Sequence, residues 1–355
     1  MTSEVNSLDK GALGRPFLAL CALGRPFLVL RALLVISLGV ASCAPQSEFV
    51  AEGEAQGTTF VVRAYGDSLE VTQDDVARWL NTYNKAASAW DPDSELSRLN
   101  RGEAVVPSPV LADLLLVTEA VRTATDSVVE PALEPVLAAW GFSVAENVLP
   151  TSGGPRSDSA LVDSLMRLVR WTAPVRASDG QLRLSGPINV NAFAQGHSVD
   201  LVLDSLRARG AVAAFVEIGG EVRSFGRKPD GESFTVGIEK PLVSGDRSLQ
   251  MTVKLDDRAL ATSGNYRKFQ VDPETGVKYG HSINPRTGWP APTDVLSATL
   301  IGPTCAEADA FATMAMVLGL EKTKLWLASH PEWDAVLIFS DPSGALQVYD
   351  SRAAY

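Results

Sequence analysis

Hydrophobic residues recur at helical spacing in several stretches of this chain. Between residues 74 and 88, for example, Trp79, Leu80 and Tyr83 form one apolar face, as in a helix that packs against a core. Gly210 directly follows the stretch 194–209 and predicts the end of a helix, because glycine readily adopts the left-handed conformation that closes one. We predict helices at 74–88, 94–100, 110–125, 159–169, 194–209 and 305–318.

Other stretches have the pattern of β-strands, and residues 58–65 show the alternation most clearly. The predicted strands are 58–65, 213–218, 221–225, 234–238, 249–255, 260–262, 296–301, 335–340 and 347–349. Gly219-Gly220 indicates a tight two-residue turn, and residues 149–157, rich in Gly, Pro and Ser, a surface loop. Because helices and hairpin strands are intermixed, we expect an α+β fold, a mixed α/β body with antiparallel hairpin strands and flanking helices.

The predicted helix 305–318 is apolar almost all round, which is typical of a buried helix. Asp309 and Thr313 are four residues apart, so their side chains lie on one face. A buried carboxylate must be paired, hydrogen-bonded or bound to a metal. Two oxygen ligands at this spacing suit Mg²⁺, but the spacing alone favours a structural role: Asp309 capping a helix or pairing with Arg, and Thr313 bonding back to a carbonyl.

The N-terminus has the features of a targeting segment. Basic residues precede an apolar run at 32–40, which is too short to span a bilayer comfortably. Val40-Ala41-Ser42-Cys43 resembles a bacterial lipoprotein processing site. We expect residues 1–42 to be a signal peptide, Cys43 to be lipidated and 43–54 to be a tether; an uncleaved anchor and an ordinary secretory signal are the alternatives.

Composition narrows the possible functions. The chain has 355 residues, enough for one large domain or two, and 46% of them are hydrophobic. A formal charge of −11 leaves no basic excess for binding nucleic acid. The three histidines are not spaced as in a zinc site. With Cys21 removed and Cys43 lipidated, only Cys305 would remain, and we expect it to be a small packed residue.

Eight short motifs occur in one order along the chain. They are GEAQGTTF (53–60), WDPDSELSRLN (90–100), VVEP continuing to WGF (128–142), NVNAFAQGHSVD (189–200), EIGGEVR (217–223), ATSGNY (261–266), GHSINPRTG (280–288) and the segment of Asp309 and Thr313. Together they resemble the FAD:protein FMN transferase family, the ApbE-like flavin transferases. The resemblance covers nearly all of the mature chain, and we expect one such domain at 55–350.

This resemblance implies a reaction and a fold. FMN would be transferred from FAD to a Thr or Ser hydroxyl of an acceptor protein, AMP would leave, and the flavin would lie between two lobes. Mg²⁺ would be held by Asp309, Thr313 and the backbone carbonyl of Ala192. His281 would act as general base or phosphate contact, so His281 and Asp309 are the expected catalytic residues. The amides around 193–196 would face the pyrophosphate at a helix N-terminus.

The resemblance also implies a set of FAD contacts. They are Gln56, Trp90, Val128, Val129, Glu130, Asn189, Gln195, Ser263, Gly264, His281 and Ile283. Stacking on the flavin would suit Trp90, and core packing is the alternative. Gln56, Glu130, Asn189 and Gln195 stand where the family commonly has Met, Asp, Asp and Lys. The changes at Asn189 and Gln195 remove one negative and one positive charge, so together they roughly conserve the local charge.

Two other functions remain open: an FAD pyrophosphatase that gives FMN and AMP, and a non-catalytic flavin-binding lipoprotein. The acidic composition would repel a negatively charged dinucleotide, which favours a metal-assisted site. We expect an exported protein, lipid-anchored at the periplasmic face of a bacterial membrane, with an acceptor in a membrane redox complex. His197 and His330 are interpreted as surface residues, the latter as a helix cap, and Asn100, Glu217 and Arg223 as structural.

Overall fold

The computed structural model describes residues 47–143, 159–241, 248–265, 269–271 and 278–353. All of them belong to one unit, Ala44–Tyr355. The expected signal peptide, the lipidated Cys43 and the loop at 149–157 lie outside the described residues. Within these ranges, no helix has the length and hydropathy that a membrane span requires.

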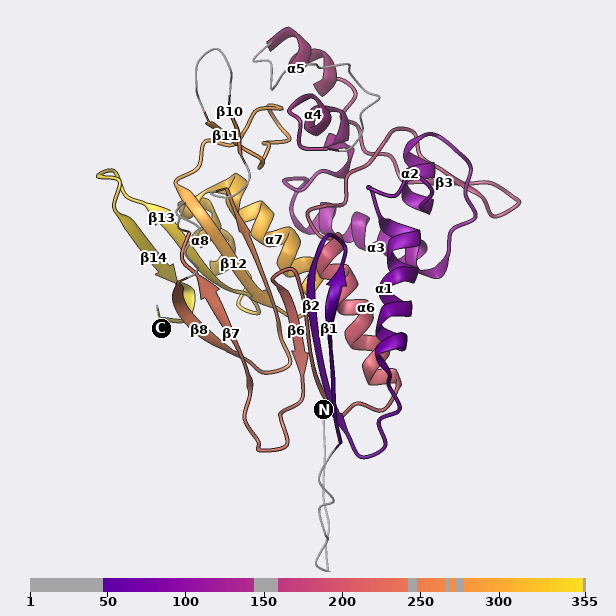
Figure 1. Ribbon diagram of the computed structural model, residues 1–355. Helices are drawn as coiled ribbons and strands as arrows, with labels where there is room; N and C mark the ends of the chain where they lie inside the picture. The colour runs from indigo at the N-terminus through magenta and orange to yellow at the C-terminus, as the bar shows by residue number, and fades with distance from the viewer. Residues whose placement is uncertain (1–46, 144–158, 242–247, 266–268, 272–277, 354–355) are drawn as a thin grey trace, which may run out of the picture. The chain divides into compact units, whose positions relative to one another are not determined.

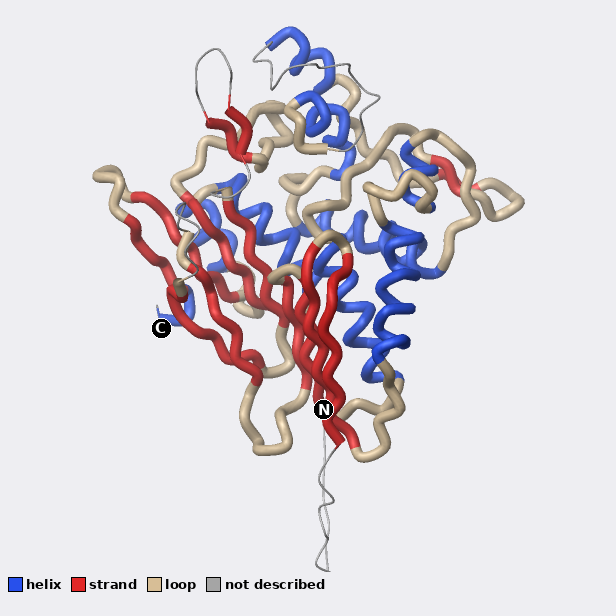
Figure 2. The backbone as a smooth tube through the Cα atoms, in the orientation of Figure 1, coloured by secondary structure: helices blue, strands red, loops and turns tan. Residues whose placement is uncertain are grey.

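An eight-stranded sheet forms the centre of the described fold (Figures 1 and 2). Each neighbouring pair of its strands is antiparallel. In order across the sheet the strands are β1 Ser47–Ala55, β2 Thr58–Gly66, β5 Ala213–Ile218, β6 Glu221–Phe225, β9 Ala259–Gly264, β12 Val295–Gly302, β13 Asp334–Ser340 and β14 Leu346–Asp350. Together with the helices, this sheet confirms the predicted α+β class.

Helices cover one face of the sheet (Figure 2). The longer ones are α1 Gln73–Ala87, α3 Pro109–Ala124, α6 Ala194–Ala208, α7 Cys305–Leu318 and α8 Leu320–Ala328. α6 packs on β5 and β6, α7 packs on β9 and β12, and α1 packs outside them on α6 and α3. The shorter helices are α2 Glu95–Asn100, α4 Glu134–Ala139, α5 Ser159–Met166 and the 3-10 turns η1 Pro131–Leu133 and η2 Ser351–Ala353.

Three two-stranded ribbons complete the described elements: β3 Val175–Arg176 with β4 Leu182–Arg183, β7 Phe234–Glu239 with β8 Leu249–Leu255, and β10 Phe269–Val271 with β11 Lys278–Gly280. Ile238 and Val253 of the β7–β8 ribbon pack with Leu260 and Ile301 of the sheet. The adjacent Ala261 instead belongs to the helix-side core. Since successive side chains of a strand point to opposite faces, β7 and β8 cover the face that the helices leave open.

The predicted tether at 43–54 is wrong from Ser47 onward. Residues Ser47–Ala55 form β1, an edge strand paired along its length with β2. The stretch looks polar because its outward positions are mostly charged, but Ala51 is buried and Phe49 packs against the core. Charged outward positions are also a usual protection for an edge strand.

Most other predicted elements are confirmed within one to three residues, including the turn at Gly219-Gly220 and the helix end at Gly210. α4 and α8 were not predicted. α4 has six residues and continues directly from a 3-10 turn, so it is too short to show a helical period. α8 begins after Gly319 alone (φ 76°), so its residues follow α7 without a separating loop.

α6 and α7 come into very close contact at Gly196. A Cβ atom built on Gly196 would lie 2.3 Å from the carbonyl oxygen of Cys305, far inside van der Waals contact. The first turns of both helices can meet only because residue 196 has no side chain.

We therefore expect Gly196→Ala to lower the free energy of unfolding by about 1–3 kcal/mol, the usual cost of overpacking. Urea unfolding followed by circular dichroism measures the change. Gly186→Ala is the matched control, because nothing lies within 4 Å of a Cβ built there. Equal urea midpoints for the two variants would contradict the close helix contact.

Candidate active site

Asp309 is a buried carboxylate on α7, 7% exposed. Its Oδ2 accepts a hydrogen bond from the backbone N–H of Gly196, at 3.1 Å. Burial raises the pKa of the Asp309 carboxyl to about 8; the Gly196 hydrogen bond opposes this shift and the charge of Asp200 adds to it. Among the described residues no Arg, Lys or His pairs with Asp309, so the alternative of an Arg partner does not hold there.

The neighbouring carboxylate, Asp200, has the partners that Asp309 lacks. It pairs with Arg223 at 2.7 Å and accepts from the N–H groups of Cys305 and Ala306 at the start of α7. Asp200 therefore caps α7, and its charge is compensated by the guanidinium and the helix N-terminus. This role of Asp200 was not predicted, whereas Arg223 is structural and Cys305 is a buried, packed residue, as expected.

Thr313 lies on α7, one helical turn after Asp309. It is half-buried and lies next to the end of β9. Its hydroxyl oxygen is 3.2 Å from that of Ser263. Gly264 is the next residue of the same strand. α7 and β9 thus bring together Asp309, Thr313 and the two expected FAD contacts Ser263 and Gly264.

Ala192 lies in the turn that leads into α6, which begins at Ala194. The N–H of Gly196 is one of the first N–H groups of α6, which have no partner within the helix, and it donates to Asp309. Within the described part of the chain, no hydrogen bond to the Ala192 carbonyl is found. Its oxygen is therefore available near the start of the helix that contacts Asp309.

The expectation that the amides of 193–196 face a pyrophosphate is wrong for three of them. The N–H groups of Phe193 and Ala194 donate to the carbonyl of Val190, and that of Gly196 donates to Asp309. Because these three N–H groups already have acceptors within the protein, they are not available as donors to an anion at the helix N-terminus.

The oxygen atoms of Asp309, Thr313 and Ala192 fit Mg²⁺ by their chemistry. They are one carboxylate, one hydroxyl and one carbonyl, which are the hard donors this ion prefers. The buried carboxylate, with no cationic partner among the described residues, is itself a reason to expect a cation. No group of three or more His, Cys, Asp or Glu suited to a metal occurs in the described ranges; this set contains only one such residue.

Gln56 lies beside the start of α6, whose second residue is Gln195. Gln56 occupies the β1–β2 turn with φ 56°, and its Oε1 accepts from Ser198 at 3.1 Å. Ser198 also bonds to the carbonyl of Gln195, whose side chain donates to the carbonyl of Ile218 at 3.0 Å. The Nε2 of Gln56 is buried without a hydrogen-bond partner, so this amide has an unused donor.

Val128, Val129 and Glu130 follow a turn in which Asp126 and Ser127 both have positive φ (48° and 56°). Such conformations are uncommon for non-glycine residues and often occur at functional sites. The carboxylate of Glu130 is occupied, however: it accepts from Arg122 and from the N–H of Ala132, both at 3.1 Å. Glu130 thus caps η1 with its side chain.

Asn189 connects this segment to the turn before α6. Its N–H donates to the carbonyl of Pro131 at 2.8 Å, and its side-chain amide donates to Glu134 at 2.7 Å. Glu134 was not predicted as a site residue; its signal would have been a Glu between Leu133 and Pro135 in an otherwise apolar stretch.

His281 is half-buried and lies edge-on to Phe142, with ring centroids 6.3 Å apart. The following Ser282 donates to the side chain of Asn265 at 3.1 Å, which ties this loop to the residue after Gly264. Ile283 is 4% exposed and packs in a small apolar cluster. Only its backbone can therefore face a ligand.

Trp90 is 74% exposed, so the alternative of core packing is wrong. Its loop follows α1 and is fixed by the Ser88 hydroxyl, which accepts from the N–H groups of Trp90 and Asp91. In the described part of the chain no hydrogen bond or ring contact joins the side chain of Trp90 to another expected site residue. A large exposed aromatic ring on a fixed loop is suited to stacking on a ligand.

His197 was predicted at the surface and is instead 4% exposed. Its ring nitrogens lie 3.2 Å from the Tyr83 hydroxyl and 2.9 Å from Asp113. Tyr83 also donates to the carbonyl of Ala194 at 2.6 Å, so this network supports the start of α6. His330 bonds to the carbonyl of Trp326 at 2.8 Å, as expected for a helix cap.

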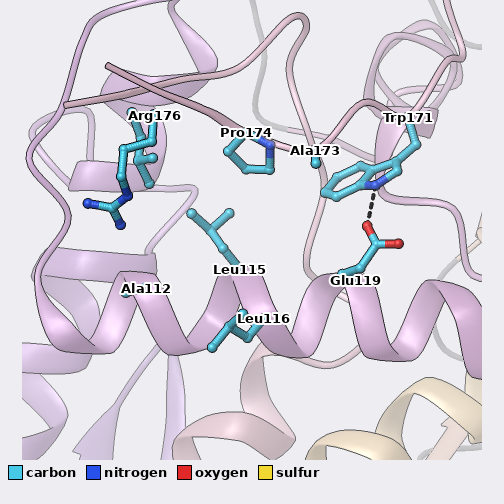
Figure 3. A pocket seen from close by; sticks show the side chains of 9 residues that line it. Ala112, Leu115, Leu116, Glu119, Trp171, Ala173, Pro174 and Arg176 are labelled. Atoms are coloured by element: carbon cyan, nitrogen blue, oxygen red, sulfur yellow. Dashed lines mark hydrogen bonds between the residues drawn. The ribbon is translucent and has the colours of Figure 1, made fainter. Parts of the chain in front are cut away.

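A separate hollow of about 560 Å³ lies along the outer face of α3 (Figure 3). Its lining is mostly apolar, and it includes Leu115, Leu116 and Trp171, whose indole donates to Glu119. None of the expected site residues lines it. The hollow is therefore distinct from the site built around α6 and α7.

Comparison with known proteins shows which family the chain is similar to. Residues 56–337 match the model of the ApbE family. The chain is 33% identical over 298 residues to the FAD:protein FMN transferase of Vibrio cholerae serotype O1, covering 80% of this chain and 85% of that protein. It is 29% identical over 302 residues to the FAD:protein FMN transferase of Haemophilus influenzae, covering 81% and 86%.

Solved structures are similar as well. Flavin Transferase ApbE from Vibrio cholerae has a TM-score of 0.72 at 26% identity, covering 86% of this chain and 98% of that one. The apo form of Pseudomonas stutzeri flavinyl transferase ApbE also has a TM-score of 0.72 at 26% identity, covering 88% and 97%. The family match extends from the β1–β2 turn through α7 into β13, and the chain belongs to the ApbE family.

Proposed function

We propose that this protein transfers FMN from FAD to a Thr or Ser hydroxyl of an acceptor protein and releases AMP. Relatives of the same family are named for transfer of FMN from FAD to protein. The observation that carries the proposal is the meeting of α6 and α7, where the Gly196 N–H orients the buried Asp309 and where the hydroxyl of Thr313 and the unbonded carbonyl of Ala192 are also found.

The three oxygen donors are the residues that would hold Mg²⁺. When bound, this ion supplies Lewis-acid polarisation of the pyrophosphate. The Gly196 N–H orients the Asp309 carboxylate, and the packing of α7 fixes the position of Thr313. A preorganised donor set matters here because phosphoryl transfer depends mainly on positioning and on charge neutralisation.

In the chemical step, the hydroxyl oxygen of the acceptor attacks the phosphorus on the FMN side of FAD. A new phosphoester bond forms, the anhydride bond to the AMP phosphate breaks, and AMP leaves with the electron pair of that bond. The hydroxyl proton passes to His281, whose imidazole suits proton transfer near neutral pH. The loop of His281 is tied through Asn265 to the end of β9.

Asp309→Ala and Thr313→Val should each reduce FMN transfer by about two orders of magnitude or more, since a bound metal supplies several kcal/mol of transition-state stabilisation. Flavin fluorescence of acceptor bands after incubation with FAD, MgCl2 and a panel of candidate acceptors measures transfer. Mass spectrometry of acceptor peptides locates the FMN.

Thr82→Val is the control, because Thr82 is an exposed helical threonine whose hydroxyl bonds to the carbonyl of Arg78. Transfer that is unchanged in Asp309→Ala would refute the metal-assisted mechanism. AMP and free FMN released equally fast with and without acceptors would instead indicate a pyrophosphatase.

The exposed ring of Trp90 is proposed to stack on the flavin. Trp90→Ala should weaken FAD binding by about 2- to 12-fold, the range expected for loss of one aromatic pair. Because the side chain is 74% exposed, thermal stability should not change. Quenching of FAD fluorescence measures the dissociation constant; Trp90→Phe should retain most of the affinity, and a constant unaffected by Trp90→Ala would exclude stacking.

We also propose export and lipid anchoring through Cys43, based on the processing-site pattern at 40–43, with an acceptor in a membrane redox complex. Cys43→Ala should move the full-length protein from the membrane fraction to the soluble fraction, or leave an unprocessed precursor. Fractionation, immunoblotting and the mass of the N-terminal peptide are the measurements. Unchanged membrane association at the mature mass would argue against lipidation.

A further inference from the structure

Glu134 is the first residue of α4, and its carboxylate is buried, 4% exposed. It accepts hydrogen bonds from the side-chain amide of Asn189, at 2.7 Å, and from the hydroxyl of Ser143. Among the described residues no Arg, Lys or His pairs with it. Burial raises the pKa of Glu134, and the two hydrogen bonds oppose that shift.

The charges around Glu134 do not explain why a carboxylate is buried at this position. The nearby Glu130 is neutralised by Arg122 at 3.1 Å, whereas Glu134 has only neutral donors. A buried carboxylate without a cation is costly, and beside a segment expected to contact a dinucleotide it would repel the phosphates. A positional role explains a buried carboxylate at this place.

Asn189 is suited to this carboxylate because an amide has both a donor and an acceptor. Its Oδ1 accepts from the N–H of Asn191 at 2.9 Å, while its Nδ2 donates to Glu134. An aspartate at 189 could accept from Asn191 but would place two carboxylates in contact. Like charges at such a distance cannot both stay ionised without a large cost.

The backbone around Asn189 is fixed from two further sides. The side chain of Asn100 bonds to both the N–H and the carbonyl of Ile188, each at 2.9 Å. The N–H of Asn189 donates to the carbonyl of Pro131, the first residue of η1, which leads into α4. Residues 188–191 are therefore held in place immediately before Ala192, and Glu134 supplies the carboxylate acceptor in that set.

We propose that Glu134 is a positioning residue: through the amide of Asn189 it sets the turn at 189–192 and directs the carbonyl of Ala192 toward Asp309 and Thr313. This inference rests on the proposed function, since the direction of that carbonyl matters only if it serves the FAD and metal site. Glu134 itself need not touch FAD, and Asn189 acts here through its two side-chain hydrogen bonds.

A double-mutant cycle in the mature chain tests the proposal, with FAD and MgCl2 as the probes. Asn189→Asp should weaken FAD binding about tenfold or more, because a buried like-charge pair readily costs the 1.4 kcal/mol of one decade. Adding Glu134→Gln should restore binding to within about threefold of wild type, since glutamine can donate to the new carboxylate. Glu134→Gln alone retains an acceptor for Asn189 and should have a small effect.

Glu95→Gln is the control for losing a glutamate charge, because Glu95 accepts from the N–H of Ser108 away from the site. Thermal midpoints are measured alongside, as a purely structural role would lower stability and leave FAD affinity unchanged. If Asn189→Asp does not fold, the double variant must fold and bind FAD. Failure of the double variant to recover, or unchanged binding in Asn189→Asp, would overturn the proposal.

The proposed function and the role of Glu134 can be tested independently of each other. If wild type binds FAD but transfers no FMN to any acceptor, while the cycle still shows rescue of binding, the positioning role stands and the transferase assignment does not. If wild type transfers FMN and all variants do so equally, the transferase assignment stands and the role of Glu134 is lost.

Discussion

The hydrogen bond from the Gly196 N–H to the Asp309 carboxylate is the contact on which the site depends. It exists because α6 and α7 meet at a residue without a side chain, where a Cβ would lie 2.3 Å from the Cys305 carbonyl. The same bond satisfies one of the first N–H groups of α6, which have no partner within the helix. One close helix contact thus orients a buried carboxylate and caps the start of a neighbouring helix.

The two neighbouring carboxylates of this region have different roles. Asp200 pairs with Arg223 and accepts hydrogen bonds from the first N–H groups of α7, so its carboxylate stabilises the start of that helix. Asp309 receives a single N–H and no cation among the described residues. Its raised pKa, about 8, follows mainly from burial. A bound divalent cation would oppose this shift, because it would compensate the charge of the carboxylate.

Side-chain amides connect the loops of the site to its rigid elements. Asn100 holds Ile188, Asn189 links the turn before α6 to Glu134, and Asn265 links the His281 loop to the end of β9. Each amide has both a donor and an acceptor and carries no charge, so it can fix irregular backbone without adding to the electrostatic field. Such links suit a site that must position a charged dinucleotide.

Local pattern alone determined much of this protein. The all-apolar helix with Asp309 and Thr313 on one face and the α+β class follow from periodicity, and periodicity is a property of neighbouring residues. The family was indicated by eight short motifs, whose order can be read along the sequence without a structure. β1 was missed because its charged outward positions hid the alternation of an edge strand, and α4 because six residues show no period.

The tertiary structure alone decided which residues meet. Gly196 and Asp309 are 113 positions apart, and Glu134 and Asn189 are 55 apart. No local pattern marks such pairs, since a hydrogen bond between distant positions depends on how whole elements pack. For the same reason His197 was expected at the surface and lies buried, and the amides of Phe193, Ala194 and Gly196 are used within the protein rather than offered to a phosphate.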